Sequence, residues 1–292
     1  MRMALDCVPC YLRQCLRALN FAGMQQLGED VLRKVMERLL ELDWTLTPME
    51  VGFEVYRILR EVTGIDDPYA EVKSRSNELA LSMLPQLREL VKSSHNALRT
   101  AVLVSVAGNA LDYGALEKVD LRKALEQAFQ KPAIDMYSEL EEELRAAESI
   151  LLFADNAGEI VFDKLMIEVI LEELGPKHVT LVVRSTPIIN DATLRDAVEA
   201  GLTRIPYIRI LELPSSSLAE YEEHKQEVIK WIEESDIVIA KGQANYELLS
   251  GIEGVFFLLK VKCQPIAREL LVPVGSTVIK RSKTFRSTKR PG

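Results

Sequence analysis

The second half of this chain alternates short apolar runs with helical stretches, and this alternation constrains the fold more than any other feature. The runs are rich in β-branched and aromatic residues, which favour strands. They occupy residues 150–154, 179–184, 207–211, 237–240 and 255–261. Strands that alternate with helices form βαβ units with parallel strands. The sequence therefore predicts an α/β fold with a doubly wound, mainly parallel sheet, and a last strand near residues 277–280 at its edge.

The first half of the chain has helical periodicity instead. Apolar residues recur at helical spacing over residues 11–19, 31–42 and 51–62. The order Thr-Pro-Met-Glu at residues 47–50 is typical of a capped helix start. We therefore predict a helical domain over residues 1–147, packed on an α/β domain over residues 148–292.

Charge and hydropathy exclude several classes of partner. The net charge of -8 argues against nucleic acid as a ligand of the whole protein. No apolar run approaches the about 20 residues that cross a membrane, and no leader segment is visible, so we expect a cytoplasmic protein without a membrane partner. The last ten or so residues are predicted to be a solvated tail, with phosphate or RNA contact as the alternative. The basic residues of this C-terminal segment begin just before the last ten residues and are Lys280, Arg281, Lys283, Arg286, Lys289 and Arg290.

Four cysteines in 292 residues are too few for a disulfide scaffold. Cys7 and Cys10 form a C-x-x-C motif, but it precedes a helix in a helical region, whereas a thioredoxin-like motif belongs to a βαβ unit. A zinc site would need further ligands, which Cys15 or Cys263 could supply. A disulfide, a zinc site and buried thiols all remain open.

The first predicted strand ends in Asp155 and Asn156, followed by Gly158 at a helix start. Open α/β proteins place their ligands in the crevice beyond the carboxyl ends of the strands. A carboxylate next to an amide oxygen suits Mg²⁺ or Mn²⁺, and a helix start favours an anion such as phosphate. The alternative is that one of these residues only caps the helix.

Three other predicted strand ends also carry polar side chains. Asn190 and Asp191 follow the strand at 179–184, where Asp191 or Thr193 could instead be a helix cap. Lys262 follows the strand at 255–261 and could neutralise a phosphate in the cleft. The alternative is that Lys260 and Lys262 only extend to solvent at the strand end. The glycine turn after 237–240 runs from Lys241 through Gly242 to Glu247 and offers donor groups from Lys241, Gln243 and Asn245. Turns beyond neighbouring parallel strands converge, so these residues predict one cleft.

The chemistry available to this cleft is restricted. None of the three histidines lies in a polar turn, which argues against a histidine base or a Ser–His–Asp triad. No glycine fingerprint for dinucleotides or nucleoside triphosphates follows a strand. Carboxylate and amide metal ligands with nearby cations remain, and this set suits hydrolysis of a phosphate ester.

The ordered motifs resemble the DUF89 family, the metal-dependent damage-control phosphatases. The matching segments are residues 155–159, 187–193 and 241–247 with Lys262, and residues 6–14 and 107–112 also resemble the family. The resemblance covers nearly the whole chain, and the C-x-x-C points to the prokaryotic and archaeal branch.

The resemblance implies a helical domain on an α/β domain, one divalent metal, and hydrolysis of phosphate monoesters. Mn²⁺ or Ni²⁺ is the first expectation, and Mg²⁺ or Co²⁺ the second. The implied substrates are sugar phosphates, nucleotides or phosphopantetheine-like compounds. The implied metal ligands and catalytic residues are Asp155, Asn156 and Asp191, with Lys262 as a further catalytic residue.

The implied substrate contacts lie in the glycine turn, at Lys241, Gly242, Gln243, Asn245 and Glu247, and at the helix start near Gly158. Asn109 and Asp112 match a segment that approaches the same cleft. The eukaryotic branch has Asp and Arg where this chain has Gln243 and Glu247, which leaves the substrate more open than the reaction.

Two alternatives belong to other functional classes. An S-adenosylmethionine-dependent carboxyl methyltransferase is one, although the glycine fingerprint is missing. A non-catalytic, metal-dependent binder of phosphorylated metabolites is the other. The sequence does not decide between attack by Asp155 and attack by water, and it predicts no oligomeric state.

Overall fold

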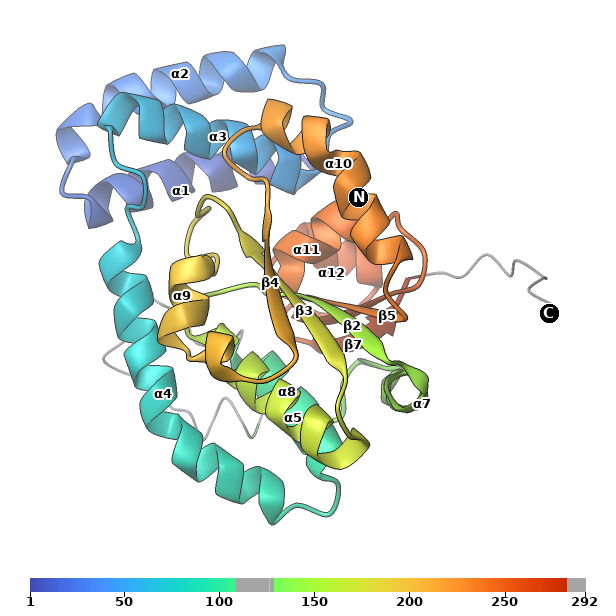
Figure 1. Cartoon of the computed structure of the whole chain (residues 1–292). Coiled ribbons are helices and arrows are strands. Elements are labelled where there is room, and N and C mark those ends of the chain that lie inside the picture. Colours follow the sequence, from blue (N-terminus) through green and yellow to red (C-terminus); the bar gives the residue numbers. More distant parts are fainter. Residues whose placement is uncertain (109–125, 127–128, 283–292) are drawn as a thin grey trace.

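A seven-stranded sheet forms the centre of the structure (Figure 1). The computed structural model describes residues 1–108, 126 and 129–282. The strand order is β1-β7-β6-β5-β2-β3-β4, and each pairing is parallel except that of β6 with β7. The strands are β1 Ile134–Asp135, β2 Ser149–Phe153, β3 His178–Arg184, β4 Ile208–Leu213, β5 Ile237–Lys241, β6 Val255–Lys260 and β7 Thr277–Arg281.

The predicted α/β fold with a mainly parallel sheet is confirmed. The edge position predicted for the last strand is wrong, because the two-residue strand β1 pairs with β7 and covers it. Helical spacing in the sequence also predicts a helix over residues 121–129, and this segment falls almost wholly outside the described residues.

The described helices cover both faces of this sheet (Figure 1). α4 continues through Pro85 without a break. The helices are α1 Cys7–Phe21, α2 Gly28–Glu41, α3 Pro48–Thr63, α4 Ala70–Lys92, α5 Ala97–Gly108, α7 Tyr137–Ala146, α8 Glu159–Leu174, α9 Leu194–Glu199, α10 Leu218–Glu233, α11 Gly242–Leu249 and α12 Gln264–Leu270.

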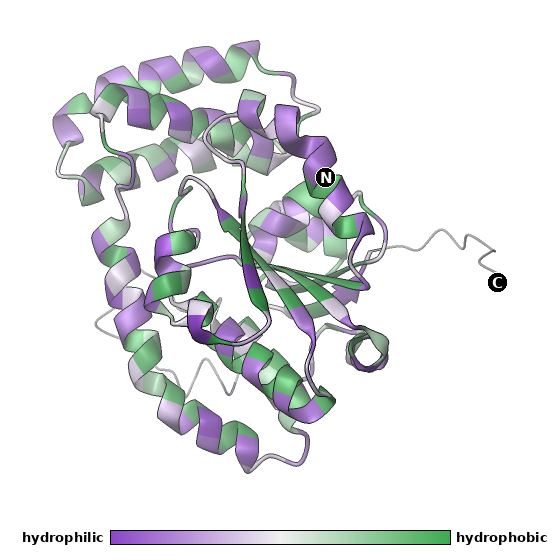
Figure 2. Cartoon of the chain, viewed as in Figure 1, coloured by the Kyte–Doolittle hydropathy of each residue, from purple (hydrophilic) through white to green (hydrophobic). Residues whose placement is uncertain are grey.

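The strands alternate between two buried cores. In β2, Ile150 and Leu152 belong to one core, which also holds residues of α4, α5 and α8. Leu151 and Phe153 belong to the other, with residues of α1, α2, α3 and α11. This is the period of two that a strand imposes on its side chains, and Figure 2 shows the central strands as largely hydrophobic.

The helices that precede residue 148 therefore contribute to both cores. α3 begins as its sequence indicates: the Thr47 hydroxyl accepts from the N–H of Glu50, and the Glu50 carboxylate accepts from the N–H of Thr47. Nowhere in residues 1–108 or 129–282 is there a helix both long and apolar enough to cross a membrane.

The topology places four strand ends at one edge of the sheet. β6, β5, β2 and β3 are consecutive neighbours and run in the same direction. The chain passes from β2 to β3 on one side, whereas β5 and β6 lie on the other, so the strand order reverses at β2. Such a switch point is where open α/β sheets bind ligands.

Candidate active site

Asp155 and Asn156 lie just beyond the end of β2. Their side chains are 6% and 7% exposed. Gly158, with φ of 77°, is the N-cap residue of α8, and no side chain in the described part of the chain caps this helix. The capping alternative is therefore wrong for Asp155 and Asn156.

Asp191 comes from the turn after β3 and lies beside this pair. Asn156 and Asp191 form an isolated antiparallel bridge, and the N–H of Ala192 donates to the carbonyl of Asp155 over 2.8 Å. Asp191 is 5% exposed. Thr193, rather than Asp191, caps α9. The backbone thus joins the two turns that carry Asp155, Asn156 and Asp191.

Arg184, the last residue of β3, orients Asp191. Its Nε donates to Oδ2 of Asp191 over 2.9 Å, and its Nη2 donates to Oδ1 of Asn245 over 3.1 Å. Burial raises the pKa of Asp191, and the charge of Arg184 opposes this shift. The buried Asn245 amide also donates to the carbonyls of Ala154 and Lys241. Asn245, expected to contact substrate, thus ties β2, β3 and β5 together.

Gly242 forms the floor beneath Asp155. It has φ of 76°, and a Cβ added there would lie 1.8 Å from Oδ2 of Asp155 and 2.0 Å from its Cγ. Only glycine lets the turn between β5 and α11 approach the carboxylate this closely, because any Cβ would overlap it.

Behind the metal-ligand candidates lies a buried ionic cluster. The Lys241 Nζ donates to Oε1 of Glu159 and to Oδ1 of Asp163, each over 2.6 Å, and all three side chains are 0% exposed. Lys241 also donates to the carbonyl of Ser105. The prediction that the Lys241 side chain contacts substrate therefore disagrees with the structure, because its ammonium is buried and pairs with Glu159 and Asp163 of α8.

Asn156 is connected to this cluster through its amide nitrogen. Nδ2 donates to Oδ2 of Asp155 over 2.6 Å and to Oε2 of Glu159 over 3.1 Å. An ionised carboxylate can only accept hydrogen bonds, so it selects the NH₂ end of the amide. Oδ1 of Asn156 accordingly lies on the opposite side of its amide group.

A cavity of about 560 Å³ opens beside these turns. Gln243, Glu247 and Lys262 line it, as do residues from α1, α3 and the turn before Asp191. Burial, followed by the negative charge of Asp155, raises the pKa of Glu247 to about 8. Glu247 thus lies on the cavity wall and within electrostatic reach of Asp155, which connects the cavity to the metal-ligand candidates.

Three thiols, those of Cys7, Cys10 and Cys263, share this cavity wall. All four cysteines of the chain are described, and all are free thiols. Burial raises the pKa of Cys7 to about 11. Of the three alternatives for Cys7 and Cys10, the structure favours thiols, here half-buried beside the cavity.

The donor set at the strand ends fits a divalent metal ion. Asp155 and Asp191 offer carboxylate oxygens and Asn156 an amide oxygen, all hard ligands. Across the described ranges, no three side chains among His, Cys, Asp and Glu are grouped to hold a metal. A metal site here thus depends on the amide oxygen of Asn156. Because the NH₂ group of Asn156 donates to Glu159, this oxygen points away from Glu159.

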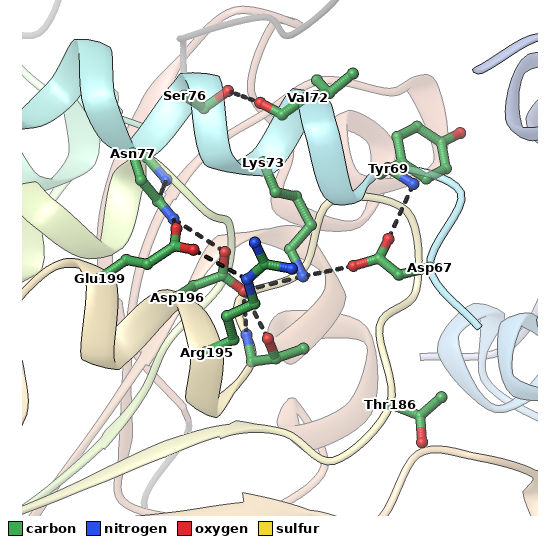
Figure 3. A network of polar contacts seen from close by, with 12 residues as sticks. Asp67, Tyr69, Val72, Lys73, Ser76, Asn77, Thr186, Arg195, Asp196 and Glu199 are labelled. Atoms are coloured by element: carbon green, nitrogen blue, oxygen red, sulfur yellow. Dashed lines mark hydrogen bonds and ion pairs between the residues drawn. The ribbon is translucent and has the colours of Figure 1, made fainter. Parts of the chain in front are cut away.

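Two other segments were expected to contact the substrate: the one with Asn109 and Asp112, and the helix start at Gly158. Asn109 and Asp112 lie outside the described residues. The N–H of Gly158, expected near a phosphate, instead donates to Oδ1 of Asn77 over 2.7 Å. Figure 3 shows the Asn77 side chain reaching from α4 toward Asp196 and Glu199 of α9, to which its Nδ2 donates.

The sequence and the fold match one family. Residues 3–278 match the damage-control phosphatase ARMT1-like domain. The chain belongs to this family. A damage-control phosphatase from Archaeoglobus fulgidus is 35% identical over 86% of this chain and 90% of that protein. One from Pyrococcus horikoshii is 33% identical over 97% of this chain and 99% of that protein.

A solved structure supports the same assignment. The crystal structure of a DUF89 family protein from Pyrococcus horikoshii has a TM-score of 0.84 and 31% identity, and the match covers 97% of this chain and 100% of that one. The resemblance to DUF89 is therefore confirmed, and the protein is a phosphatase of the damage-control family.

Sequence reasoning missed part of this candidate site. Arg184 was assigned only to a strand, although it holds Asp191. Glu159 and Asp163 are one helical turn apart at the start of α8, and this spacing places them on one helix face. A buried cation facing both could have been anticipated from that spacing.

Proposed function

We propose that this protein is a metal-dependent phosphate monoester hydrolase that acts on small phosphorylated metabolites. Asp155, Asn156 and Asp191 hold the metal ion, with Mn²⁺ or Ni²⁺ as the first candidates and Mg²⁺ or Co²⁺ as the second. One observation carries the proposal: the bridge between Asn156 and Asp191 gathers three hard donors at the switch point of the sheet. The family membership supports the phosphatase chemistry.

A bound metal ion supplies Lewis-acid polarisation of the phosphoryl group. The protein's own residues contribute position and charge. Arg184 fixes Asp191, and Gly242 leaves room for Asp155. The exposed Lys262 adds a positive charge at the cavity wall, where it favours an anionic phosphoryl group.

The cavity is proposed to receive the alcohol part of the substrate. Its volume of about 560 Å³ accommodates a small metabolite. Gln243 and Glu247 offer polar contacts there, while Tyr11, Met49 and Ile188 add apolar surface. This mixed wall favours leaving groups that carry both hydroxyl or amide groups and carbon-rich surface.

A panel of phosphate esters tests the proposal. The metal-free full chain is assayed with p-nitrophenyl phosphate and with sugar phosphates, nucleotides and phosphopantetheine, each with Mn²⁺, Ni²⁺, Mg²⁺ or Co²⁺. We expect phosphate release that requires metal and is lost in Asp155→Ala. Near wild-type activity of Asp155→Ala would refute the site. Ligand binding without turnover would favour the binder, and metal-independent binding of S-adenosylmethionine the methyltransferase.

A further inference from the structure

The amide of Asn156 is held between two carboxylates. Its Nδ2 donates to Asp155 Oδ2 and to Glu159 Oε2 over 2.6 Å and 3.1 Å. The two ends of an amide differ completely in chemistry, since only the oxygen can bind a cation. Whatever fixes the NH₂ end therefore decides which end is available as a metal ligand.

Glu159 is itself fixed by Lys241. The ammonium contacts Oε1 of Glu159 over 2.6 Å, while the other oxygen, Oε2, accepts from Asn156. Neither side chain is exposed. Lys241 ends β5 and Glu159 begins α8, so two rigid elements clamp this carboxylate.

We propose that Glu159, clamped by Lys241, is a positioning residue that turns the amide oxygen of Asn156 toward the metal ion. This inference rests on the proposed metal site. Groups that orient metal ligands from behind commonly change metal affinity by about 10- to 100-fold when they are removed. Lys241 acquires here a role other than substrate contact.

Glu159→Gln tests this role with almost no change in shape. The introduced amide must keep its oxygen toward Lys241, so its NH₂ faces the NH₂ of Asn156. Two donors cannot pair, so the Asn156 amide loses its contact with the side chain at position 159 and keeps only the one to Asp155 Oδ2. The amide oxygen is then no longer held in place by two carboxylates, and we expect Mn²⁺ to bind about 10- to 100-fold more weakly.

Asp163→Asn is the matched control. Asp163 lies on the same helix, contacts the same Lys241 ammonium and is equally buried, but no hydrogen bond connects it to Asn156 among those the structure describes. Its Oδ2 has no hydrogen-bond partner in the described part of the chain, so the new NH₂ displaces no existing contact. This variant removes the same charge, and we expect its Mn²⁺ affinity to stay within about threefold of wild type, well below the change expected for a positioning group.

Mn²⁺ affinity is measured on the metal-free full chain by electron paramagnetic resonance titration, independently of activity. Circular dichroism establishes that each variant is folded. Equal affinities in Glu159→Gln and wild type, or equal losses in Glu159→Gln and Asp163→Asn, would overturn the inference, because a general effect of charge removal predicts equal losses.

If Glu159→Gln does not fold, Glu159→Asp decides the question. It keeps the charge beside Lys241 but is one methylene too short to reach both Lys241 and Asn156, and we again expect weaker Mn²⁺ binding. Unchanged binding would contradict the inference. If wild type and Asp155→Ala bind Mn²⁺ equally poorly, the proposed metal site itself fails, and that result is distinct from a failure of the Glu159 role.

Discussion

Replacement of Gly242 by alanine should displace Asp155 and remove most of the phosphatase activity. The added Cβ would lie 1.8 Å, 2.0 Å and 2.6 Å from Oδ2, Cγ and Oδ1 of Asp155, whereas ordinary contact begins near 3.4 Å. The carboxylate must therefore move by more than an ångström. A displacement of about 1 Å at a reacting group costs on the order of 100-fold in rate.

The same substitution also strains the backbone, and a second glycine separates the two effects. Gly254 has φ of 79°, close to the 76° of Gly242, but a Cβ added there meets nothing within 4 Å. Left-handed backbone costs a non-glycine residue about 1–2 kcal/mol. Both variants should lose at least this much stability, but only Gly242→Ala should lose activity.

The assay is metal-dependent phosphate release at a temperature where both variants are folded, with urea unfolding as the measure of stability. We expect kcat/KM of Gly242→Ala to fall about 100-fold or more, and that of Gly254→Ala to stay near wild type. If the two variants lose activity to the same degree, the close approach of Gly242 to Asp155 has no catalytic consequence and the argument is refuted.

Three further predictions concern stability. Lys241→Met leaves two buried carboxylates without their cation and should lower the free energy of unfolding by about 3–5 kcal/mol, whereas the exposed Lys230→Met should change it by less than about 0.5 kcal/mol in urea titrations. Burial raises the pKa of Asp163 from 3.8 to about 6. The folded state therefore retains a proton that the unfolded chain has released, so this group's contribution to stability falls as pH rises from 4 to 6. Asp163→Asn should lack this dependence, and parallel pH profiles for variant and wild type would contradict the assignment. Thr47→Ala removes the cap of α3 and should cost about 1 kcal/mol, and an unchanged unfolding midpoint would contradict this.

The sequence predicted the parts of the site that depend on strand order alone. Asp155 and Asp191 follow strands whose alternation with helices implied parallel neighbours, and parallel strands place their carboxyl ends at one edge. Their positions after the carboxyl ends of parallel strands were therefore enough to predict that the two residues lie close together.

Side-chain direction was harder to predict. Lys241 shares strand parity with Ile239, which packs in the core with α8, so its ammonium points toward Glu159 rather than toward the cavity. The period of two was visible in the sequence, but which helices cover which face was not. Arg184 was missed for a different reason, because its partner Asp191 is positioned by a turn rather than by periodicity.

The cavity wall joins residues that lie far apart in the sequence, and this has a consequence for synthesis. Tyr11 in α1 forms one wall, while Lys262 and Pro265 form another. Asp6 and Arg268 pair across the same junction, and the amino group of Met1 donates to Ser250. Because synthesis proceeds from the N-terminus, the wall that Tyr11 begins is completed only by residues more than 240 positions later. A nascent or truncated chain that stops before β6 thus contains Asp155 and Asp191 but lacks the part of the cavity wall that Lys262 and Pro265 form.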